Sequence, residues 1–557
     1  MAQEFKLKLD SLDMRNGEKR EVEVEGIENG KVLLAKVHDE VHAMSANCTH
    51  YGAPLIKGVI TGSGRLTCAW HGACFNVATG DVEDSPAIDP LAKFPVSEKN
   101  GGVYITGDAE TIKANRGKAD LKCSVQGQEK VVIVGGGSGT IGALEGLRKS
   151  GYKGAITLIS REPYLPIDRT KLSKALIADP SKLALHDAEW FKSTSVETVT
   201  DDVTSVDFTA KKVSTESGKS FAYTKLILAT GGTPKKLPLP GFKDLNNVFL
   251  LRTIPDVKAI LGAVGESKGK KIVVIGSSFI GMEVANALSS ENDVTVVGME
   301  KAPLERVMGQ QVGSIFRRIL ENNGVKFHME ASVDHASPSD SSPSTVGAVH
   351  LKDGTTLPAD LVVLGIGVSP ATEFLQSSSS SLPLEKDGSL RTTEHFTIPS
   401  LPDVYAIGDI ATYPYHGPGG DGALTRIEHW NVAQNAGRAV GHHIARTSSS
   451  SSGKSPQPPP AKRFIPIFWS ALGSQLRYCG NTPNGWDDVV LQGNPDDNSF
   501  AAFYTLGDTV VAVATMMMDP VMSHSAELMR RGKMLGKREL RDGADVLGVS
   551  VPAELKI

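Results

Sequence analysis

Two cysteines and two histidines lie at matched spacing near the start of the chain. Cys48 and His50 form a C-x-H motif. After 17 intervening residues, Cys68 and His71 form a C-x-x-H motif. Thiolates and imidazoles suit either a tetrahedral zinc ion or a two-iron cluster in which two thiolates hold one iron and two imidazoles the other. Because each motif supplies one ligand of each kind, whereas common zinc modules pair like with like, the order favours the cluster.

The sequence around these four residues indicates which kind of metal centre they form. The strings CTHYGAPL and CAWHGACFNVATGDV closely resemble Rieske ferredoxins, and this resemblance implies that the four residues bind a Rieske 2Fe-2S cluster. The Rieske domains of respiratory complexes have an additional cysteine in each loop, where this chain has Ala53 and Trp70. We therefore expect no disulfide between the loops, and a reduction potential toward the low end of the Rieske range, about −150 mV.

A first nucleotide-binding motif begins at residue 131. The string VVIVGGGSGTIGALEGLR predicts a strand, a glycine-rich turn and a helix, and AITLIS predicts the next strand. Gly135 permits the tight turn, and Gly137 lets the backbone approach a pyrophosphate at the helix N-terminus, next to Ser138. Thr140 replaces the third glycine of the fingerprint. Glu162 follows the second strand, where a carboxylate could bind ribose hydroxyl groups.

A second motif of the same kind begins at residue 271, in the string KIVVIGSSFIGMEVANAL. Its three fingerprint positions are occupied by Gly276, Ser278 and Gly281. Glu300 closes the following strand, 24 residues after the first of these, where a carboxylate hydrogen-bonds the adenosine ribose and repels a 2′-phosphate. We therefore predict NADH rather than NADPH, although two nearby cations, Lys301 and Arg306, could accommodate a phosphate.

Further strings in this region resemble a known family. PYLPIDRTKLSK, KLILATGGTP, DVYAIGDIA and RIEHWNVAQNAGRA occur in this order. They resemble the FAD-dependent pyridine nucleotide reductases, specifically the branch of NADH-dependent ferredoxin reductases and apoptosis-inducing-factor-like proteins, over nearly the whole of residues 128–557. The resemblance implies that the chain binds FAD and NADH.

The two motifs and this resemblance together assign the site residues. The residues expected to contact FAD are Gly135, Gly137, Ser138, Glu162, Arg169, Lys174, Val203, Arg252, Asp409, Glu428, His429, Trp430 and Trp469. The residues expected at the NAD site are Gly276, Ser278, Phe279, Ile280, Gly281, Glu300 and Gly367. The resemblance also implies that Lys174 and Glu283 tune the flavin and orient the nicotinamide. We do not expect them to act as an acid and a base, because hydride transfer needs no proton from the protein.

We predict a multi-domain protein with an N-terminal all-β Rieske domain, two α/β Rossmann-like domains for FAD and NAD, and a C-terminal α+β domain. The predicted boundaries are 1–112 for the Rieske domain, 113–128 for a linker, 129–257 and 386–450 for the FAD domain, 258–385 for the NAD domain, 451–463 for a Ser/Pro-rich linker and 464–557 for the C-terminal domain. Three Ser/Pro-rich stretches, 336–345, 376–381 and 448–460, are predicted to be flexible surface insertions.

Composition limits the partners and the compartment. The chain has 59 Lys and Arg against 63 Asp and Glu and no strongly basic block, so we expect no nucleic-acid partner. No apolar run approaches the roughly 18 residues that cross a bilayer, so we expect no membrane span. The opening MAQEFKLKLD has neither a signal core nor a transit pattern. This favours the cytoplasm, with the mitochondrion as the alternative, and we expect a monomer or a homodimer.

The predicted function is electron transfer from NADH through FAD to the Rieske cluster and on to an acceptor. None of the five cysteines is placed as the redox pair of a disulfide reductase, and we find no ligand set for the mononuclear iron of a Rieske oxygenase. One alternative is an apoptosis-inducing-factor-like redox-sensing or signalling protein, in which NADH binding rather than turnover is the function. Another is a zinc-stabilised β domain attached to a flavoprotein.

Overall fold

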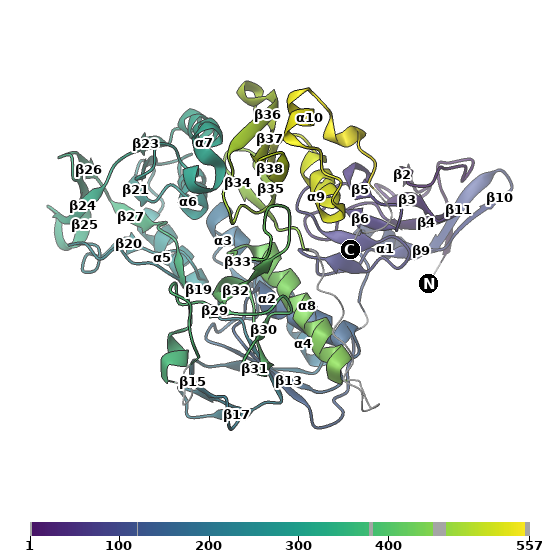
Figure 1. Cartoon of the computed structure of the whole chain (residues 1–557), viewed down its shortest axis with the longest axis horizontal. Coiled ribbons are helices and arrows are strands. Elements are labelled where there is room, and N and C mark those ends of the chain that lie inside the picture. The colour runs from purple at the N-terminus through teal and green to yellow at the C-terminus, as the bar shows by residue number, and fades with distance from the viewer. Residues whose placement is uncertain (1–2, 120, 378–381, 449–463, 552–557) are drawn as a thin grey trace.

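The structure is a computed structural model that describes residues 3–119, 121–377, 382–448 and 464–551. Figure 1 shows the N-terminal domain at the right beside α9 and α10, the two parallel-sheet domains at the bottom and the left, and the C-terminal sheet at the top centre. The sheets confirm the predicted fold class, with an all-β N-terminal domain, two Rossmann-like sheets and a C-terminal antiparallel sheet. The linker predicted at 451–463 lies outside the described residues.

The N-terminal domain is built from antiparallel strands. They are β2 (Lys19–Glu23), β3 (Lys31–Val37), β4 (Glu40–Ser45) and β9 (Lys93–Phe94) in one sheet; β1 (Gln3–Lys6), β11 (Gly102–Gly107) and β10 (Val96–Lys99) in a second; and β5 (Val59–Ile60), β6 (Arg65–Thr67), β7 (Cys74–Asn76) and β8 (Val82–Asp84) in a third. The first Cys/His motif follows β4, and the second forms the connection from β6 to β7. Helix α1 (Ala109–Ala114) spans the boundary predicted at residue 112.

The first nucleotide-binding fold has a mostly parallel sheet. Its strands are β14 (Val196–Thr200), β13 (Ala155–Ser160), β12 (Lys130–Val134), β18 (Lys225–Leu228), β31 (Leu401–Ala406) and the antiparallel β30 (Thr397–Ile398). Its helices are α2 (Ser138–Lys149), α3 (Thr170–Lys174), α4 (Ala188–Ser193) and α8 (Trp430–Ser448). Two smaller sheets complete it, formed by β15 (Val203–Asp207), β16 (Lys212–Thr215) and β17 (Ser220–Ala222), and by β29 (Leu390–Arg391), β32 (Ala411–Tyr415) and β33 (Ala423–Thr425).

The second nucleotide-binding fold repeats this plan. Its parallel sheet contains β20 (Val248–Phe249), β27 (Leu361–Leu364), β21 (Lys271–Ile275), β22 (Asp293–Val297) and β23 (Lys326–His328). Its helices are α5 (Ile254–Val264), α6 (Phe279–Leu288) and α7 (Glu305–Asn322). The strands β24 (Val333–Ser339), β25 (Ser342–Leu351) and β26 (Thr356–Pro358) form a further sheet, and β19 (Gly232–Pro234) pairs with β28 (Val368–Pro370).

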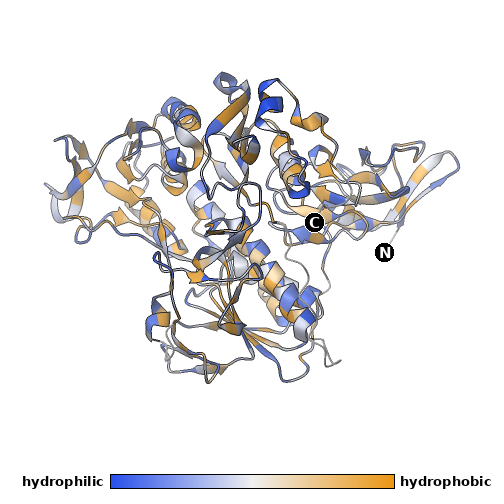
Figure 2. Cartoon of the chain, viewed as in Figure 1, coloured by the Kyte–Doolittle hydropathy of each residue, from blue (hydrophilic) through white to orange (hydrophobic). Residues whose placement is uncertain are grey.

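The C-terminal domain is a five-stranded antiparallel sheet with two helices. Its strands, in sheet order, are β34 (Ile467–Ala471), β35 (Gln475–Gly480), β38 (Thr509–Met516), β37 (Ser499–Leu506) and β36 (Asp488–Asn494). The helices are α9 (Val521–Arg531) and α10 (Lys537–Arg541). Figure 2 shows apolar residues gathered along the strands of each domain and polar residues over much of the helical surface. Burial of the apolar strands therefore stabilises the domains, and one continuous core joins the second nucleotide-binding fold to the C-terminal sheet.

One of the Ser/Pro-rich stretches is not the flexible insertion that its composition predicts. Residues 336–339 end β24 and residues 342–345 begin β25, and the two segments pair in an antiparallel hairpin. The prediction was wrong here because backbone pairing across the hairpin outweighs the low strand propensity of Ser and Pro.

Helices α2 and α8 approach each other closely because glycine occupies the contact. A Cβ atom at Gly437 would overlap the carbonyl oxygen of Gly139, and one at Gly142 would overlap the carbonyl oxygen of Gln434. The N-terminus of α2 carries the first glycine-rich turn, and the N-terminus of α8 begins at Trp430. Their close packing therefore fixes the relative position of two predicted cofactor-binding segments.

We predict that Gly437→Ala destabilises the protein by about 1–3 kcal/mol, because the added methyl group has no space against the α2 backbone. Gly262→Ala in α5 is the matched control: no atom lies within 4 Å of its Cβ position. There alanine should stabilise the helix by about 0.5–1 kcal/mol. Thermal and denaturant unfolding measure both changes, and equal effects of the two substitutions would contradict this account of the contact.

Candidate functional site

A cavity of about 240 Å³ lies where the first nucleotide-binding fold, the second fold and β34 meet. The predicted FAD-site residues that line it are Gly137, Ser138, Arg169, Lys174, Arg252, Asp409, Glu428, His429, Trp430 and Trp469. Phe279, Ile280 and Glu283 line the same cavity, from α6. Phe279 and Ile280, which we expected at the NAD site, begin α6 and lie in this cavity. Gly135, Glu162 and Val203 do not line this cavity.

Arginines and carboxylates form two ion pairs along one wall. Arg169 donates from Nη1 and Nη2 to the two oxygens of Glu162, at 2.8 and 2.6 Å, and from Nη1 to the carbonyl of Arg252 at 2.8 Å. Arg252 Nη2 in turn lies 3.0 Å from Asp409 Oδ2. Burial opposes the charge on Arg169, but the Glu162 carboxylate raises the pKa of that guanidinium. Glu162 therefore holds Arg169 at the cavity, and both its oxygens are engaged in that contact.

Lys174 and Glu283, which both line the cavity, form an ion pair. Lys174 Nζ lies 2.9 Å from Glu283 Oε1. The hydroxyl groups of Ser173 and Ser470 donate to the two carboxylate oxygens of Glu283, which is almost completely buried. Residues from α3 and β34 thus fix the orientation of the Glu283 carboxylate, which belongs to α6. No sequence motif indicated the two serines, because they are distant from Glu283 along the chain.

Two orphaned polar atoms indicate that this cavity fits a cofactor. His429 Nδ1 and Trp469 Nε1 are buried and have no hydrogen-bond partner, although buried polar groups are normally paired. Burial also lowers the pKa of His429 to about 4, so the imidazole is neutral near pH 7. The same cavity has the glycine-rich turn at Gly137, where no atom lies within 4 Å of a Cβ position. Polar ring atoms and an open turn suit a planar, phosphate-bearing group such as FAD.

The two Cys/His motifs form matching loops. Cys48 N–H donates to Ala53 O and Cys68 N–H to Ala73 O, both at 2.8 Å. In each loop a glycine at positive φ, Gly52 or Gly72, closes back onto the cysteine carbonyl. The repeated backbone pattern brings the ligands of the two loops side by side.

The four predicted ligands are arranged as two like pairs. The side chain of Cys68 and burial raise the pKa of the Cys48 thiol, so the two thiols lie close together, and His50 Nδ1 lies 3.1 Å from His71 Nδ1. Among the described residues, no group of three or more His, Cys, Asp or Glu side chains could hold one metal ion. A thiol pair beside an imidazole pair fits a two-iron cluster with one pair on each iron, and does not fit a single tetrahedral zinc site.

The imidazole pair faces the predicted flavin cavity. The ring of Trp469, which lines that cavity, lies 4.4 Å from the ring of His71 and 5.4 Å from that of His50, measured between centroids. Tyr51 stacks on His50 at 3.7 Å, and its hydroxyl group donates to Asp168, which immediately precedes Arg169. At Gly72, any Cβ atom would overlap Ile467 of β34. The metal-binding loops are thus packed directly against the cofactor cavity.

A second cavity of about 500 Å³ lies at the second glycine-rich turn. The predicted NAD-site residues that line it are Gly276, Ser278, Glu300 and Gly367. Gly281 does not line the cavity; it is buried where α6 starts, and a Cβ atom there would overlap the carbonyl of Gly276. Glu300 accepts a hydrogen bond from Ser277 Oγ at 3.2 Å and pairs with Arg306 Nε at 2.8 Å. Arg306 therefore belongs to this site and forms an ion pair with the Glu300 carboxylate.

Comparisons with known proteins give three matches to families. The family described as pyridine nucleotide-disulphide oxidoreductase matches residues 129–437, the Rieske 2Fe-2S domain matches residues 5–95, and the reductase C-terminal domain matches residues 467–548. In the described part of the chain, no helix is both long and apolar enough to span a membrane.

Individual relatives agree with these matches. Human apoptosis-inducing factor 3 is 37% identical over 537 residues, which cover 95% of this chain and 84% of the relative. Rhodocoxin reductase of Rhodococcus erythropolis is 31% identical over 392 residues, covering 69% of this chain and 86% of the relative. The crystal structure of a covalent putidaredoxin reductase–putidaredoxin complex shares 29% identity with a TM-score of 0.65, covering 72% of this chain and 93% of that chain.

We predict that two neighbouring glycines of the first turn fail in different ways when replaced by alanine. Gly137→Ala should leave the apoprotein as stable as the wild type and lower its FAD content, because a methyl group would fill the open space that a pyrophosphate approaches. Gly135→Ala should destabilise the apoprotein itself by more than about 1 kcal/mol, because Gly135 has a φ of 109° and its Cβ would overlap Ala229.

The flavin-to-protein absorbance ratio and the thermal midpoint of the apoprotein separate the two effects. A Gly137→Ala protein with full FAD content would show that the pyrophosphate does not approach this turn.

Proposed function

The chain belongs to the pyridine nucleotide-disulphide oxidoreductase family and carries a Rieske 2Fe-2S domain, and on this premise we propose that it passes electrons from NADH through FAD to its own cluster and on to an acceptor. The observation that carries the proposal is the position of Trp469. Its ring lines the FAD cavity and lies 4.4 Å from the ring of His71. The likeness to a reductase joined to its redox partner in one complex supports the same direction of transfer.

The residues of the cavity have separate tasks in this proposal. When bound, FAD accepts a hydride from NADH and releases the two electrons singly, and the 2Fe-2S cluster takes one electron at a time. Lys174 presents a cation at the cavity, and Glu283 holds its Nζ at 2.9 Å. Phe279 and Phe468 pack edge to face at 4.9 Å and also line the cavity. They cover it with apolar surface, which excludes water from the place where the nicotinamide would meet the flavin.

Glu300 supports the proposed preference for NADH over NADPH, and Arg306 makes that preference weaker. A carboxylate at this position accepts hydrogen bonds from a ribose diol and repels a 2′-phosphate. Arg306 pairs with Glu300 in the absence of coenzyme and is largely exposed, so it can turn toward a phosphate. We propose that NADH is preferred and that NADPH is also accepted.

A second candidate function rests on the 37% identity to human apoptosis-inducing factor 3 over 95% of this chain. In this candidate, NADH binding signals the redox state and turnover is incidental. Steady-state kinetics separates the two candidates. Rapid reduction of cytochrome c supports the reductase, whereas a long-lived complex of reduced flavin and NAD with negligible turnover supports the sensor.

We predict that anaerobic titration with NADH reduces both centres. The end point should be at about 1.5 equivalents of NADH per protein, because the flavin takes two electrons and the cluster one. Absorbance follows the flavin, and electron paramagnetic resonance follows the cluster. His50→Ala and Cys68→Ser should abolish the paramagnetic signal and cytochrome c reduction while NADH still bleaches the flavin and ferricyanide is still reduced. A wild-type protein whose cluster stays oxidised beside a fully reduced flavin would rule out the proposed route.

We predict that Trp469→Leu slows electron transfer from flavin to cluster, because it removes the ring between the cavity and His71. Stopped-flow absorbance should show an unchanged first phase of flavin reduction by NADH and a slower second phase of cluster reduction. Trp190→Leu provides the control, since Trp190 stacks on His186 at 4.0 Å and does not line the FAD cavity. If both variants reduced the cluster at the wild-type rate, Trp469 would have no part in the route.

We predict that Glu300→Ala raises the KM for NADH about tenfold, because a charged hydrogen bond worth about 1.5 kcal/mol or more is lost only with NADH. The KM for NADPH should fall, because the carboxylate that repels the 2′-phosphate is removed. Glu321→Ala, at the exposed far end of α7, is the control and should change neither constant. A parallel rise in both constants would show that Glu300 supports the fold of the site and does not read the ribose.

A further inference from the structure

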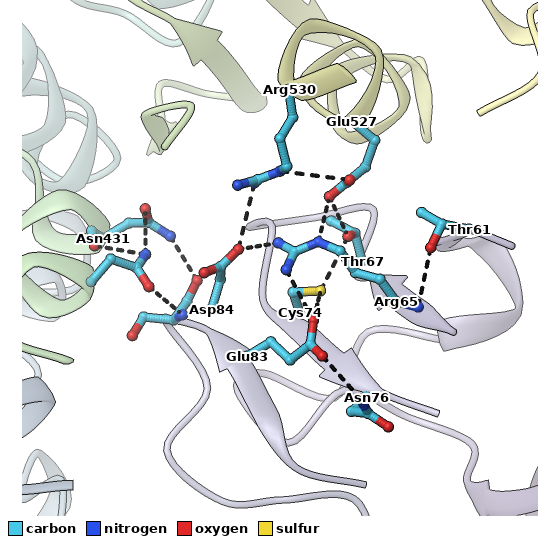
Figure 3. A network of polar contacts seen from close by, with 12 residues as sticks. Thr61, Arg65, Thr67, Cys74, Asn76, Glu83, Asp84, Asn431, Glu527 and Arg530 are labelled. Carbon is cyan, nitrogen blue, oxygen red and sulfur yellow. Dashed lines mark hydrogen bonds and ion pairs between the residues drawn. The ribbon is translucent and has the colours of Figure 1, made fainter. Parts of the chain in front are cut away.

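A buried ionic network joins the Rieske domain to the C-terminal domain, and we call it the docking network: Arg65, Glu83, Asp84, Glu527, Arg530 and Arg531. Figure 3 shows Arg65 at its centre, reaching from β6 toward Glu527 on α9. Arg65 Nε donates to Glu527 Oε1 at 3.0 Å and Nη1 to Glu83 Oε2 at 3.0 Å, while Nη2 pairs with Asp84. One guanidinium group of the Rieske domain thus contacts three carboxylates.

On the α9 side of the network, one carboxylate, that of Glu527, is surrounded by arginines. Glu527 is fully buried, pairs with Arg531, accepts a hydrogen bond from Thr67 Oγ1 at 2.9 Å and lies 3.6 Å from Arg530 Nε. Arg530 Nη2 reaches back across the interface to Asp84 Oδ2 at 3.5 Å. Burial alone would raise the pKa of Glu527, but Arg65, Arg530 and Arg531 lower it to about 2. Three cations and three carboxylates therefore balance one another, and all of them except Glu83 are buried.

The turn after β8 is attached to a second element of the reductase. Ser85 N–H donates to Asn435 Oδ1 at 3.0 Å, and Asn431 Nδ2 donates to Ser85 O at 2.7 Å. Both asparagines lie on α8, and Asn431 also lines the FAD cavity. The same segment of the Rieske domain, Asp84 and Ser85, is therefore held by α9 on one side and by α8 on the other.

The connecting chain is also held along its length. On the Rieske side, Asn115 Oδ1 accepts from Ala46 N–H at 2.8 Å, and Arg116 Nη1 pairs with Asp89 at 2.9 Å. On the reductase side, Cys123 N–H donates to Ser193 O at 3.0 Å and Gln126 N–H to Lys153 O at 2.8 Å. The segment predicted as a linker is thus hydrogen-bonded to both domains that it joins.

Buried ion pairs contribute little net stability, because desolvation offsets their attraction, but they penalise every arrangement that leaves one charge unpaired. The docking network therefore acts on the orientation of the Rieske domain more than on the strength of its attachment. Because β6 leads directly into the loop that contains Cys68 and His71, a rotation that moved β6 away from α9 would displace His71 and separate Arg65 from Glu527, leaving a charge without its partner.

We propose that Arg65 and Glu527 are positioning residues for internal electron transfer, which hold the Rieske domain in one docked orientation throughout turnover so that the cluster is a fixed relay and not a tethered shuttle. The inference deepens the proposed function and rests on its route from flavin to cluster. The transfer itself is unchanged: one electron leaves the reduced flavin and enters the oxidised cluster.

The test uses the full chain with FAD and cluster bound. In the wild type, the first-order rate of cluster reduction after NADH mixing should be independent of salt and of viscosity, because no domain movement precedes it. Glu527→Gln keeps the side-chain volume but leaves three guanidinium groups with less compensation, and should slow cluster reduction about tenfold or more. Arg65→Lys keeps the positive charge but removes the guanidinium group that contacts three carboxylates at once. It should also slow cluster reduction, by a smaller factor.

The control lies across the same interface at an exposed position. Lys149 Nζ pairs with Asp81 Oδ1 at 3.1 Å, with side chains 30% and 48% exposed. Lys149→Ala should leave the rate unchanged, because exposed ion pairs contribute little. In all variants, flavin reduction by NADH and the paramagnetic spectrum of the cluster should match the wild type, which separates a change of position from damage to either centre.

Hydrogen exchange supplies a readout that does not depend on activity. In the resting wild-type protein, amides of β6, α9 and the loop 68–74 should be protected, and Glu527→Gln should lower that protection while Lys149→Ala does not. A wild-type rate that falls with viscosity, or variants with wild-type rate and wild-type exchange, would overturn the fixed relay. A protected interface in a protein whose cluster NADH never reduces would instead refute the proposed route while leaving the docked orientation in place.

Discussion

The contact between the His71 and Trp469 rings is the constraint on which the rest of the structure depends. It joins a loop of the N-terminal domain to a strand of the C-terminal domain, across a cavity built mainly from the two nucleotide-binding folds. Gly72 permits it by leaving space for Ile467, and Tyr51 supports it from the other side by reaching Asp168. Each of the four units thus contributes backbone or side chains to one short region between two cofactor sites.

Strand β34 serves both centres because neighbouring residues of a strand point to opposite faces. Trp469 faces the imidazole pair, whereas Ser470 donates to Glu283, the partner of Lys174. A shift of this strand by one residue would therefore disturb the flavin side and the cluster side together. Its pairing with β35, from Ile467↔Cys479 to Ala471↔Gln475, fixes that register.

Local sequence predicted the parts of the site that depend on local chemistry. The Cys/His spacing and the glycine-rich turns require particular residues at short range, and the pair Lys174 and Glu283 came from a family resemblance. Contacts between distant segments were beyond that reasoning: Arg65 and Glu527 are separated by 462 positions, and neither stands in a recognisable motif. The Ser/Pro-rich hairpin was misjudged because tertiary pairing overrides composition. A sequence motif also does not show which way a helix faces, so it did not reveal that Phe279 and Ile280 share a cavity with Lys174.

The two asparagines and two arginines that contact Asp84 and Ser85 also bear on how such a chain evolves. Here the complementary charges are divided between β6, β8 and α9, so a substitution on either side requires a matching one on the other. The Rieske domain is therefore no longer an interchangeable module: it can be inherited with this reductase, but it cannot be exchanged for another ferredoxin without rebuilding α9.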